Sequence, residues 1–182
     1  MSALNRETTE PSAVLRAGRF EDAPRLTEIE NAADALLIDL LAPMRWDPAP
    51  DGASRMRMPG FVLVLSETMD AQAVGFVHVI ELEGCAHLEQ LSVVPSSARR
   101  GFGRKLVDAA KTEAGCRGYD RMTLRTYADV PWNAPFYATC GFVETEPETA
   151  LERRLLASEQ LPGLGQYGRR IQMSGRTDSS RR

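Results

Sequence analysis

Residues 91–107 have the sequence LSVVPSSARRGFGRKLV, and this stretch decides the fold. It opens with an apolar run that is typical of a β-strand, and Pro95 is expected to end that strand because proline has no backbone N–H to donate. Gly101 and Gly103 follow, and apolar residues then recur at helical spacing as far as Gly118. The sequence therefore predicts a strand, a glycine-containing loop and a helix that begins near Gly103.

A loop of this kind can bind an anion, because the first backbone N–H groups of a helix have no partner inside the helix. The two glycines let the backbone approach a bulky diphosphate, and neighbouring cations can add charge-assisted hydrogen bonds. These cations are Arg99, Arg100, Arg104 and Lys105. A dinucleotide-binding loop would need a third glycine where Leu106 stands, and the chain has no GxxxxGK[ST] string. The alternative interpretation is a glycine turn whose arginines only face water.

The rest of the chain alternates between strands and helices. Residues 13–41 predict a short strand and a helix with Asp22 as its N-cap, and residues 42–60, rich in proline and glycine, predict a long binding loop. Further strands are predicted at 61–67, 73–84, 85–94, 121–127, 142–146 and 169–174, and further helices at 132–141 and 150–161. This order indicates one mixed α/β domain around a single sheet.

Composition limits the class of protein. A chain of 182 residues with 43% hydrophobic and 26% charged residues is ordinary for one domain with its own core. No apolar run has the length of a membrane span, the first twelve residues lack the apolar core of a signal peptide, and the three cysteines form no CxxC pair. We therefore expect a cytoplasmic protein that does not enter membranes. The net charge of −3 gives no general attraction for nucleic acid.

The central stretch resembles the acyl-CoA-binding signature of the GNAT superfamily of N-acetyltransferases. In that family a strand ending in V-x-P leads to a [QR]-x-x-G-x-[GA] loop and a helix that holds the coenzyme A pyrophosphate. Gly101 and Gly103 fill the two small positions, and Val93 stands at the usual distance before them. Ala98 departs from the usual glutamine or arginine, and Arg99 replaces a common glycine, which can change the side chains that touch phosphate.

A second segment, RTYADVPWNAPFYATCGF at 125–142, is similar to a later part of the same family. Tyr137 falls at the place of the tyrosine that often protonates the departing thiolate, and Asn133 lies near the position of a coenzyme-contacting asparagine. A structural alternative exists for the tyrosine, because with Asn133 as N-cap, Trp132 and Tyr137 occupy the positions of a hydrophobic staple. Both roles are compatible, since a staple would fix the ring and leave the hydroxyl free.

The resemblance covers residues 13–174, which are expected to form the acetyltransferase domain, with disordered tails at 1–12 and 175–182. It implies a mostly antiparallel sheet with helices on both faces, splayed between residues 88–94 and 122–126 to admit the pantetheine arm. It also implies acetyl-CoA as cosubstrate, an amine acceptor that is a small molecule or a peptide, and a chain that could pair as a homodimer. The implied coenzyme-binding residues are Leu91, Ser92, Val93, Arg99, Arg100, Gly101, Phe102, Gly103, Arg104, Lys105, Asn133 and Tyr137.

The predicted strand at 85–94 carries two candidates for the general base that an ammonium acceptor requires. Strict alternation would place His87, Glu89, Leu91 and Val93 on one face, and Leu88, Gln90, Ser92 and Val94 on the other. Glu89 or His87 could take the proton directly or through water, while the structural alternative for each is an ordinary polar residue of the sheet. Cys85 and His87 are too few for a zinc site, so no metal is expected.

Two functions of different classes fit these observations. The first is an enzyme that moves an acetyl group from acetyl-CoA to a primary amine by direct attack in a ternary complex. The second is a module that binds an acyl-CoA or another phosphate ligand without turnover, as a sensor or regulatory partner. Release of coenzyme A in the presence of an amine would distinguish the two.

Overall fold

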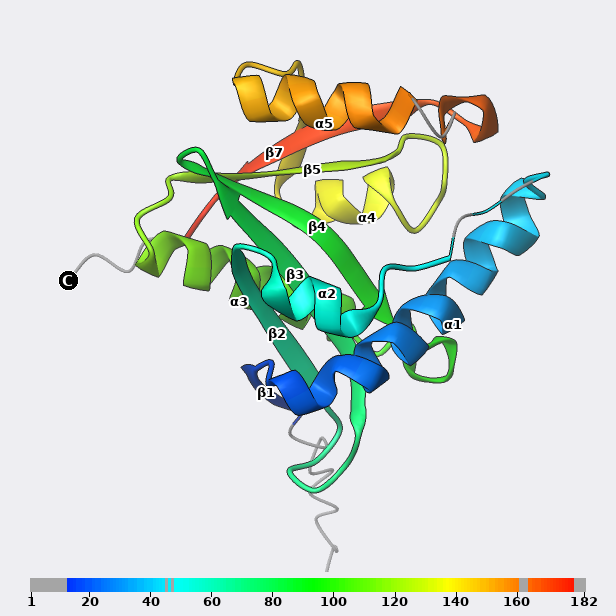
Figure 1. The fold of residues 1–182 in the computed structure, drawn as a ribbon, viewed down its shortest axis with the longest axis vertical. Coiled ribbons are helices and arrows are strands. Elements are labelled where there is room, and N and C mark those ends of the chain that lie inside the picture. The colour runs from blue at the N-terminus through cyan, green and yellow to red at the C-terminus, as the bar shows by residue number, and fades with distance from the viewer. Residues whose placement is uncertain (1–12, 45, 47, 161–163, 179–182) are drawn as a thin grey trace, which may run out of the picture.

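The structure, a computed structural model, describes residues 13–44, 46, 48–160 and 164–178. The described residues form a seven-stranded sheet in the order β1-β2-β3-β4-β5-β7-β6 (Figure 1). Its strands are β1 (Val14–Ala17), β2 (Gly60–Ser66), β3 (Ala73–Leu82), β4 (Cys85–Val93), β5 (Arg121–Tyr127), β6 (Phe142–Thr145) and β7 (Arg170–Arg176). The α-helices are α1 (Ala23–Leu41), α2 (Gly52–Arg57), α3 (Phe102–Cys116), α4 (Ala134–Thr139) and α5 (Ala150–Gln160).

Helices cover both faces of the sheet, as Figure 1 shows for α1 and α2 in front of the central strands and α3 behind them. On the α1 face, Leu26 and Ile29 pack against Val64 and Phe76 of the sheet. The larger core lies on the other face, where α3 and α4 pack on β2 to β7. It contains Leu65, Val77, Val79, Leu88, Leu106, Val107, Ala110, Leu124, Tyr137, Phe142 and Met173.

The middle of the sheet is split. β4 and β5 are parallel neighbours, and they pair only from Ala86–Met122 to Leu88–Leu124. Beyond that point β4 still pairs with β3 and β5 still pairs with β7, so the two strands diverge. All other described strand pairs are antiparallel. The predicted fold, a mostly antiparallel sheet splayed between these strands with helices on both faces, is confirmed.

A β-bulge in β4 corrects the predicted alternation of side chains. His78 of β3 pairs with Gln90 and the next residue, Val79, pairs with Leu88, so Glu89 is the extra residue of the bulge. His87 therefore shares its face with Gln90 and Ser92, while Leu91 and Val93 pack against the α3-side core. Strict alternation had grouped Leu91 and Val93 with His87, and the extra residue reverses that grouping.

Two other details of the sequence prediction change. The predicted loop at 42–60 contains α2, whose N-cap Asp51 accepts hydrogen bonds from the backbone N–H groups of Ala53 and Ser54. β7 continues to Arg176, past the predicted domain boundary at residue 174. Residues 1–12 and 179–182 of the two predicted tails lie outside the described residues. Among the helices that are described, none is both long and apolar enough to cross a membrane.

Candidate active site

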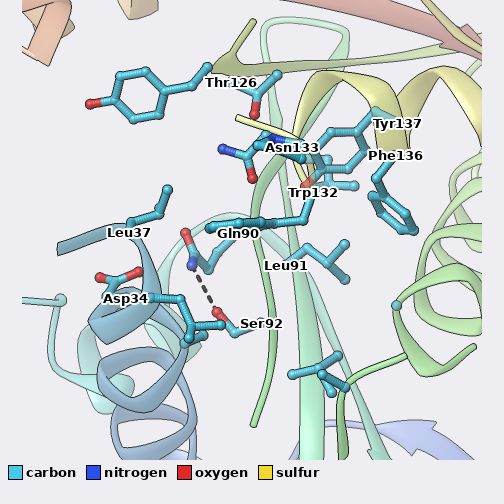
Figure 2. A pocket seen from close by; sticks show the side chains of 18 of the residues that line it. Asp34, Leu37, Gln90, Leu91, Ser92, Thr126, Trp132, Asn133, Phe136 and Tyr137 are labelled. Atoms are coloured by element: carbon cyan, nitrogen blue, oxygen red, sulfur yellow. Dashed lines mark hydrogen bonds between the residues drawn. The ribbon is translucent and has the colours of Figure 1, made fainter. Parts of the chain in front are cut away.

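A cleft of about 730 Å³ lies where β4 and β5 diverge. Its walls come from α1, from β4 beyond the split, from the start of α3 and from the segment leading into α4. Figure 2 shows Asp34 and Leu37 on one side, Trp132, Asn133 and Tyr137 on the other, and Gln90 to Ser92 between them. The volume is in the range of small-molecule sites, which are concave and mostly apolar with a few polar groups.

One end of the cleft is formed by the N-terminus of α3. Gly101 is the N-cap with a φ of 79°, and Lys105 makes the first hydrogen bond of the helix, from its N–H to the Gly101 carbonyl at 3.0 Å. The N–H groups of Phe102, Gly103 and Arg104 have no acceptor within the helix, as at any helix start. Gly101 and Gly103 both line the cleft, so these donors meet open space where a diphosphate could lie.

Gly103 packs closely against α4, so a larger residue would require the Phe136 ring to shift by a few tenths of an ångström. A Cβ atom at this position would lie 3.3 Å from Cζ of Phe136, which belongs to α4. The first turn of α3 and the ring of Phe136 therefore stand side by side at the cleft. Gly101 differs, since a Cβ there meets nothing within 4 Å and the left-handed backbone alone favours glycine.

The loop before α3 is held in place by one carboxylate. Glu67 accepts a hydrogen bond from Ser97 Oγ at 2.9 Å and forms an ion pair with Arg100, whose guanidinium also lies over the Phe102 ring. These contacts fix the loop before any ligand arrives. Arg99 adopts a φ of 60°, a left-handed conformation that glycine adopts at lower cost.

The four predicted cations are placed differently. Arg99 and Arg104 line the cleft, whereas Arg100 and Lys105 are not among its lining residues. Arg104 also donates from Nη2 to the Thr139 carbonyl at 3.0 Å and to Thr139 Oγ1 at 2.8 Å, which ties α3 to the end of α4. The other predicted coenzyme-binding residues all line the cleft: Leu91, Ser92, Val93, Gly101, Phe102, Gly103, Asn133 and Tyr137.

Tyr137 lies on the wall of the cleft with its ring almost covered. The ring stands edge-on to Phe136 and Phe142, with centroids 5.2 and 5.9 Å away. Burial raises the pKa of the hydroxyl, and the nearby Cys140 thiol raises it further. The hydroxyl has no hydrogen-bond partner among the described residues. The Tyr137 hydroxyl therefore stays protonated at neutral pH, on a residue that lines the cleft.

Glu89 projects from the bulge into the cleft. Its side chain is solvent-accessible there, yet protein surrounds the carboxyl closely enough that burial raises its pKa. Arg55 and Arg170 lower the same pKa and Glu159 raises it, so charged groups from α2, α5 and β7 all face this carboxyl. A carboxylate with a raised pKa is a better proton acceptor than an ordinary surface glutamate.

His87 does not line the cleft. It is 3% exposed, and its Nδ1 lies 2.8 Å from Thr123 Oγ1 on the paired strand. Burial lowers the pKa of the imidazole to about 4, so it is neutral at pH 7. The structure thus brings Glu89 and Tyr137 together at one cleft, whereas His87 is buried outside the cleft.

The far end of the cleft is formed by residues that the sequence reasoning did not single out. Asp34 accepts a hydrogen bond from Trp46 Nε1 at 3.4 Å, and burial raises the pKa of its carboxyl. The other residues at this end are Ala33, Leu36, Leu37, Arg125, Tyr127 and Arg170. Asp34 carried a usable signal, because it is a charge inside the otherwise apolar helical segment 32–38.

Below Asp34 lies a buried ion pair. Arg55 donates from Nε to Glu30 Oε2 at 2.8 Å and forms a second bond through Nη2, and both side chains are almost fully covered. Its Nη1 lies 3.2 Å from Nδ1 of His78, which must be an acceptor because arginine only donates. This cluster joins α1, α2 and β3, and it fixes the helix that carries Asp34.

Comparisons with known proteins agree with this geometry. Residues 26–142 match the model of the Acetyltransferase (GNAT) family. The chain is 21% identical to the ribosomal-protein-S18-alanine N-acetyltransferase from Escherichia coli, with a TM-score of 0.65 over 91% of this chain and 94% of that one. It is also similar to PaiA N-acetyltransferase from Thermoplasma acidophilum in complex with coenzyme A, at 15% identity and a TM-score of 0.63, over 91% and 99%.

N-acetylglutamate synthase from Neisseria gonorrhoeae, complexed with coenzyme A and N-acetyl-glutamate, is similar over 91% of this chain and 35% of its own, at 14% identity and a TM-score of 0.66. At these identities the likenesses show a shared fold. The family model extends over more than half of the chain, from α1 to the start of β6. The chain belongs to the GNAT family of acetyltransferases.

Proposed function

We propose that this protein transfers the acetyl group of acetyl-CoA to a primary amine of a small molecule or peptide, by direct attack in a ternary complex. One observation carries the proposal. A single cleft runs from the free N–H groups at the start of α3, past Tyr137 and Glu89 at the split of the sheet, to the carboxylate of Asp34. A phosphate site, a proton donor, a proton acceptor and an anionic site for an ammonium thus share one space.

The coenzyme end fits acetyl-CoA in charge and shape. The N-terminus of a 15-residue helix and the cation of Arg99 suit a diphosphate, and Leu91 and Val93 give an apolar wall for the arm that follows it. β4 beyond Leu88 has no β5 partner, so its backbone groups on that side are available to the amides of the arm. Two similar structures are complexes with coenzyme A, which supports the same ligand here.

One side chain accepts a proton from the amine, and another donates a proton to the departing sulfur. Acetyl-CoA supplies the thioester carbon that the amine attacks and the thiolate that leaves. Glu89 removes a proton from the incoming ammonium, directly or through water, and Asp34 helps to hold that ammonium at the mouth of the split. Tyr137 gives its proton to the departing sulfur, and its raised pKa keeps that proton in place until the thiolate forms.

Direct attack is favoured over an acyl-enzyme because no cysteine is among the described residues that line the cleft. Cys140 lies near Tyr137 but is 5% exposed, and burial raises the pKa of its thiol, which makes it a poor nucleophile. The acceptor amine is therefore expected to reach the thioester while both substrates are bound. Initial rates that vary with both substrates should give intersecting lines in double-reciprocal plots.

The experiment that tests the proposal is an acceptor screen with acetyl-CoA that measures free thiol. Amines, amino acids, polyamines and peptides form the panel, and mass spectrometry then checks the best acceptor for a gain of one acetyl group. Thiol release that requires an amine supports the enzyme. Tight coenzyme A binding with no thiol release in the whole panel would favour the non-catalytic module instead.

A further inference from the structure

We propose that the acceptor carries a carboxylate beside its amine, and that Arg125 and Arg170 bind this carboxylate; the acceptor is then an amino acid or a close relative. The proposal rests on the proposed function and narrows its substrate class. It comes from the distribution of charge around the split of the sheet.

The two strands that border the split carry opposite charges. The last paired residues of β4 and β5 are Leu88 and Leu124, so Glu89 and Arg125 are the first residues of the two strands beyond the pairing. Both line the cleft. An acceptor that reaches the thioester there meets a carboxylate from one strand and a guanidinium from the other.

The guanidinium of Arg125 belongs to a hydrogen-bonded group of two cations and one anion, and Arg170 of this group also lowers the pKa of the Glu89 carboxyl. Arg125 Nε donates to Glu159 Oε2 at 2.7 Å, and Arg170 donates to both oxygens of the same carboxylate, with Nε at 3.3 Å from Oε2. One anion thus faces two cations. The arginine side chains are 5% and 18% exposed, so this charge is held in a largely covered place, where it is weakly screened.

The group has donors to spare. Within the described ranges, Arg125 uses only Nε for Glu159, and Nη1 of Arg170 has no hydrogen-bond partner. The Arg170 guanidinium also lies over the Tyr127 ring, 4.6 Å from its centroid, which fixes its plane. Two arginines with fixed planes and free N–H groups suit the two oxygens of a carboxylate.

Both arginines border the cleft. Arg125 and Arg170 line the main cleft and also a neighbouring cavity of about 420 Å³, so they stand between the two. On the opposite wall the cleft presents Asp34, and the cation of Arg55 beneath it is already paired with Glu30. The walls therefore differ in sign, negative for an ammonium and positive for a carboxylate.

A purely structural role of Arg125 and Arg170 would not explain why two arginines contact one carboxylate at this position. Glu159 lies on α5, and its ion pairs with β5 and β7 fasten that helix to the sheet. One arginine would suffice for this task, as Arg121 shows by holding Glu152 of the same helix at 2.9 Å. The second guanidinium and its position at the split are what the carboxylate site accounts for.

The test uses matched acceptors. Each amino acid of the acceptor screen is compared with its own α-carboxamide, which keeps the amine and the side chain and removes the negative charge. The ratio of kcat/KM for acid and amide should favour the acid by about 10- to 100-fold, the range for charge-assisted hydrogen bonds. Thiol release with amines but with equal rates for acid and amide would overturn this inference and leave the proposed function standing. Absence of thiol release with every amine would instead remove the proposed function.

Variants then locate the charge. R170Q and R125Q should each reduce the acid-to-amide ratio at least about 10-fold, whereas R169Q, which removes the neighbouring exposed cation that pairs with Glu144, should keep the wild-type ratio. Calorimetry with coenzyme A and a melting curve show whether each variant is folded. If R170Q does not fold, R125Q and R170K test the assignment instead. R170K should lower the acid-to-amide ratio in part, because lysine cannot donate two parallel N–H bonds to a carboxylate as a guanidinium does. An unchanged ratio in folded R125Q and R170Q would contradict the assignment.

Discussion

The two ends of the cleft are built in different ways. The coenzyme end comes from one continuous segment, the loop and first turn at 95–104, and its donors are backbone N–H groups. The opposite end, where we propose that the acceptor binds, gathers side chains from α1, β4, β5 and β7 and the residue Trp46, which are far apart in the sequence. A site made of backbone tolerates many side chains, whereas a site made of side chains changes with each substitution.

Tyr137, where the two ends meet, should show the largest effect. In Y137F the ring keeps its edge-on contacts with Phe136 and Phe142, and only the proton donor is lost. Turnover is expected to fall by roughly 10²- to 10⁴-fold, the range for a lost general acid. Steady-state kinetics of thiol release measures this.

Y137F should bind coenzyme A with wild-type affinity and melt at the wild-type temperature. Full turnover in Y137F would assign the proton to water or another group. Lost affinity or lost stability would make the tyrosine a structural residue of α4.

The role of Glu89 at the proposed acceptor end can be tested by the pH dependence of kcat/KM. If its ionised form is the base, kcat/KM should fall as the pH drops through the raised pKa of its carboxyl, and E89Q should lose this acidic limb together with roughly 10²-fold of the rate at neutral pH. A pH–rate profile that keeps its acidic limb in E89Q would move the base to another group, such as Asp34.

The same variant should be more stable than wild type. Burial raises the pKa of Glu89, so the folded state disfavours the ionised form, and the stability of the wild type is lost as the pH rises through this pKa. E89Q should therefore melt higher at pH 7, and the gain should vanish as the pH approaches the ordinary glutamate value of about 4.3. Thermal melts between pH 4 and pH 8 measure this trade of stability for function.

Gly101 tests the coenzyme end. G101V forces a β-branched residue into a φ of 79° at the N-cap of α3, which displaces the free N–H groups. Coenzyme A affinity should fall by about 10- to 150-fold, equivalent to the 1.5 to 3 kcal/mol of a hydrogen bond to a charged group. Titration calorimetry gives the value.

G118V is the matched control, since Gly118 has a φ of 93° just past the other end of α3 and also has nothing within 4 Å of a Cβ. It should lose similar stability and keep its coenzyme affinity. Equal affinity losses in both variants would mean that G101V acts through the stability of the helix and not through an anion site.

Arg99 should give the smallest effect. R99G relieves the left-handed backbone at a φ of 60°, but it also frees the unfolded chain, so the free energy of unfolding should change by no more than about 1 kcal/mol. Coenzyme A affinity should nevertheless decrease and become less sensitive to salt, because a cation at the cleft is lost. Unchanged affinity in R99G would leave the backbone as the main diphosphate ligand.

The sequence was informative where the structure follows a local rule. Pro95, Gly101 and Gly103 define the strand end, the loop and the helix start, because each acts through its own backbone. The bulge at Glu89 was not predicted, since strict alternation of side chains assumes that every residue of a strand pairs with one residue of its neighbour. Arg125 and Arg170 were missed for another reason. They meet only after strands distant in sequence are placed side by side, and no local pattern carries that information.

The short pairing of β4 with β5 divides the sheet into two parts, one from β1 to β4 and the other of β5, β7 and β6. Residues 86–88 and 122–124 supply the backbone bonds between the two parts, and α3 packs across both. A ligand bound in the split would connect the two parts of the sheet, because it can form hydrogen bonds with the backbone of both strands where they no longer pair with each other. Those backbone amides of residues 89–93 and 125–127 that point into the split should then exchange with deuterium far more slowly when coenzyme A is bound, so the substrate itself completes the sheet.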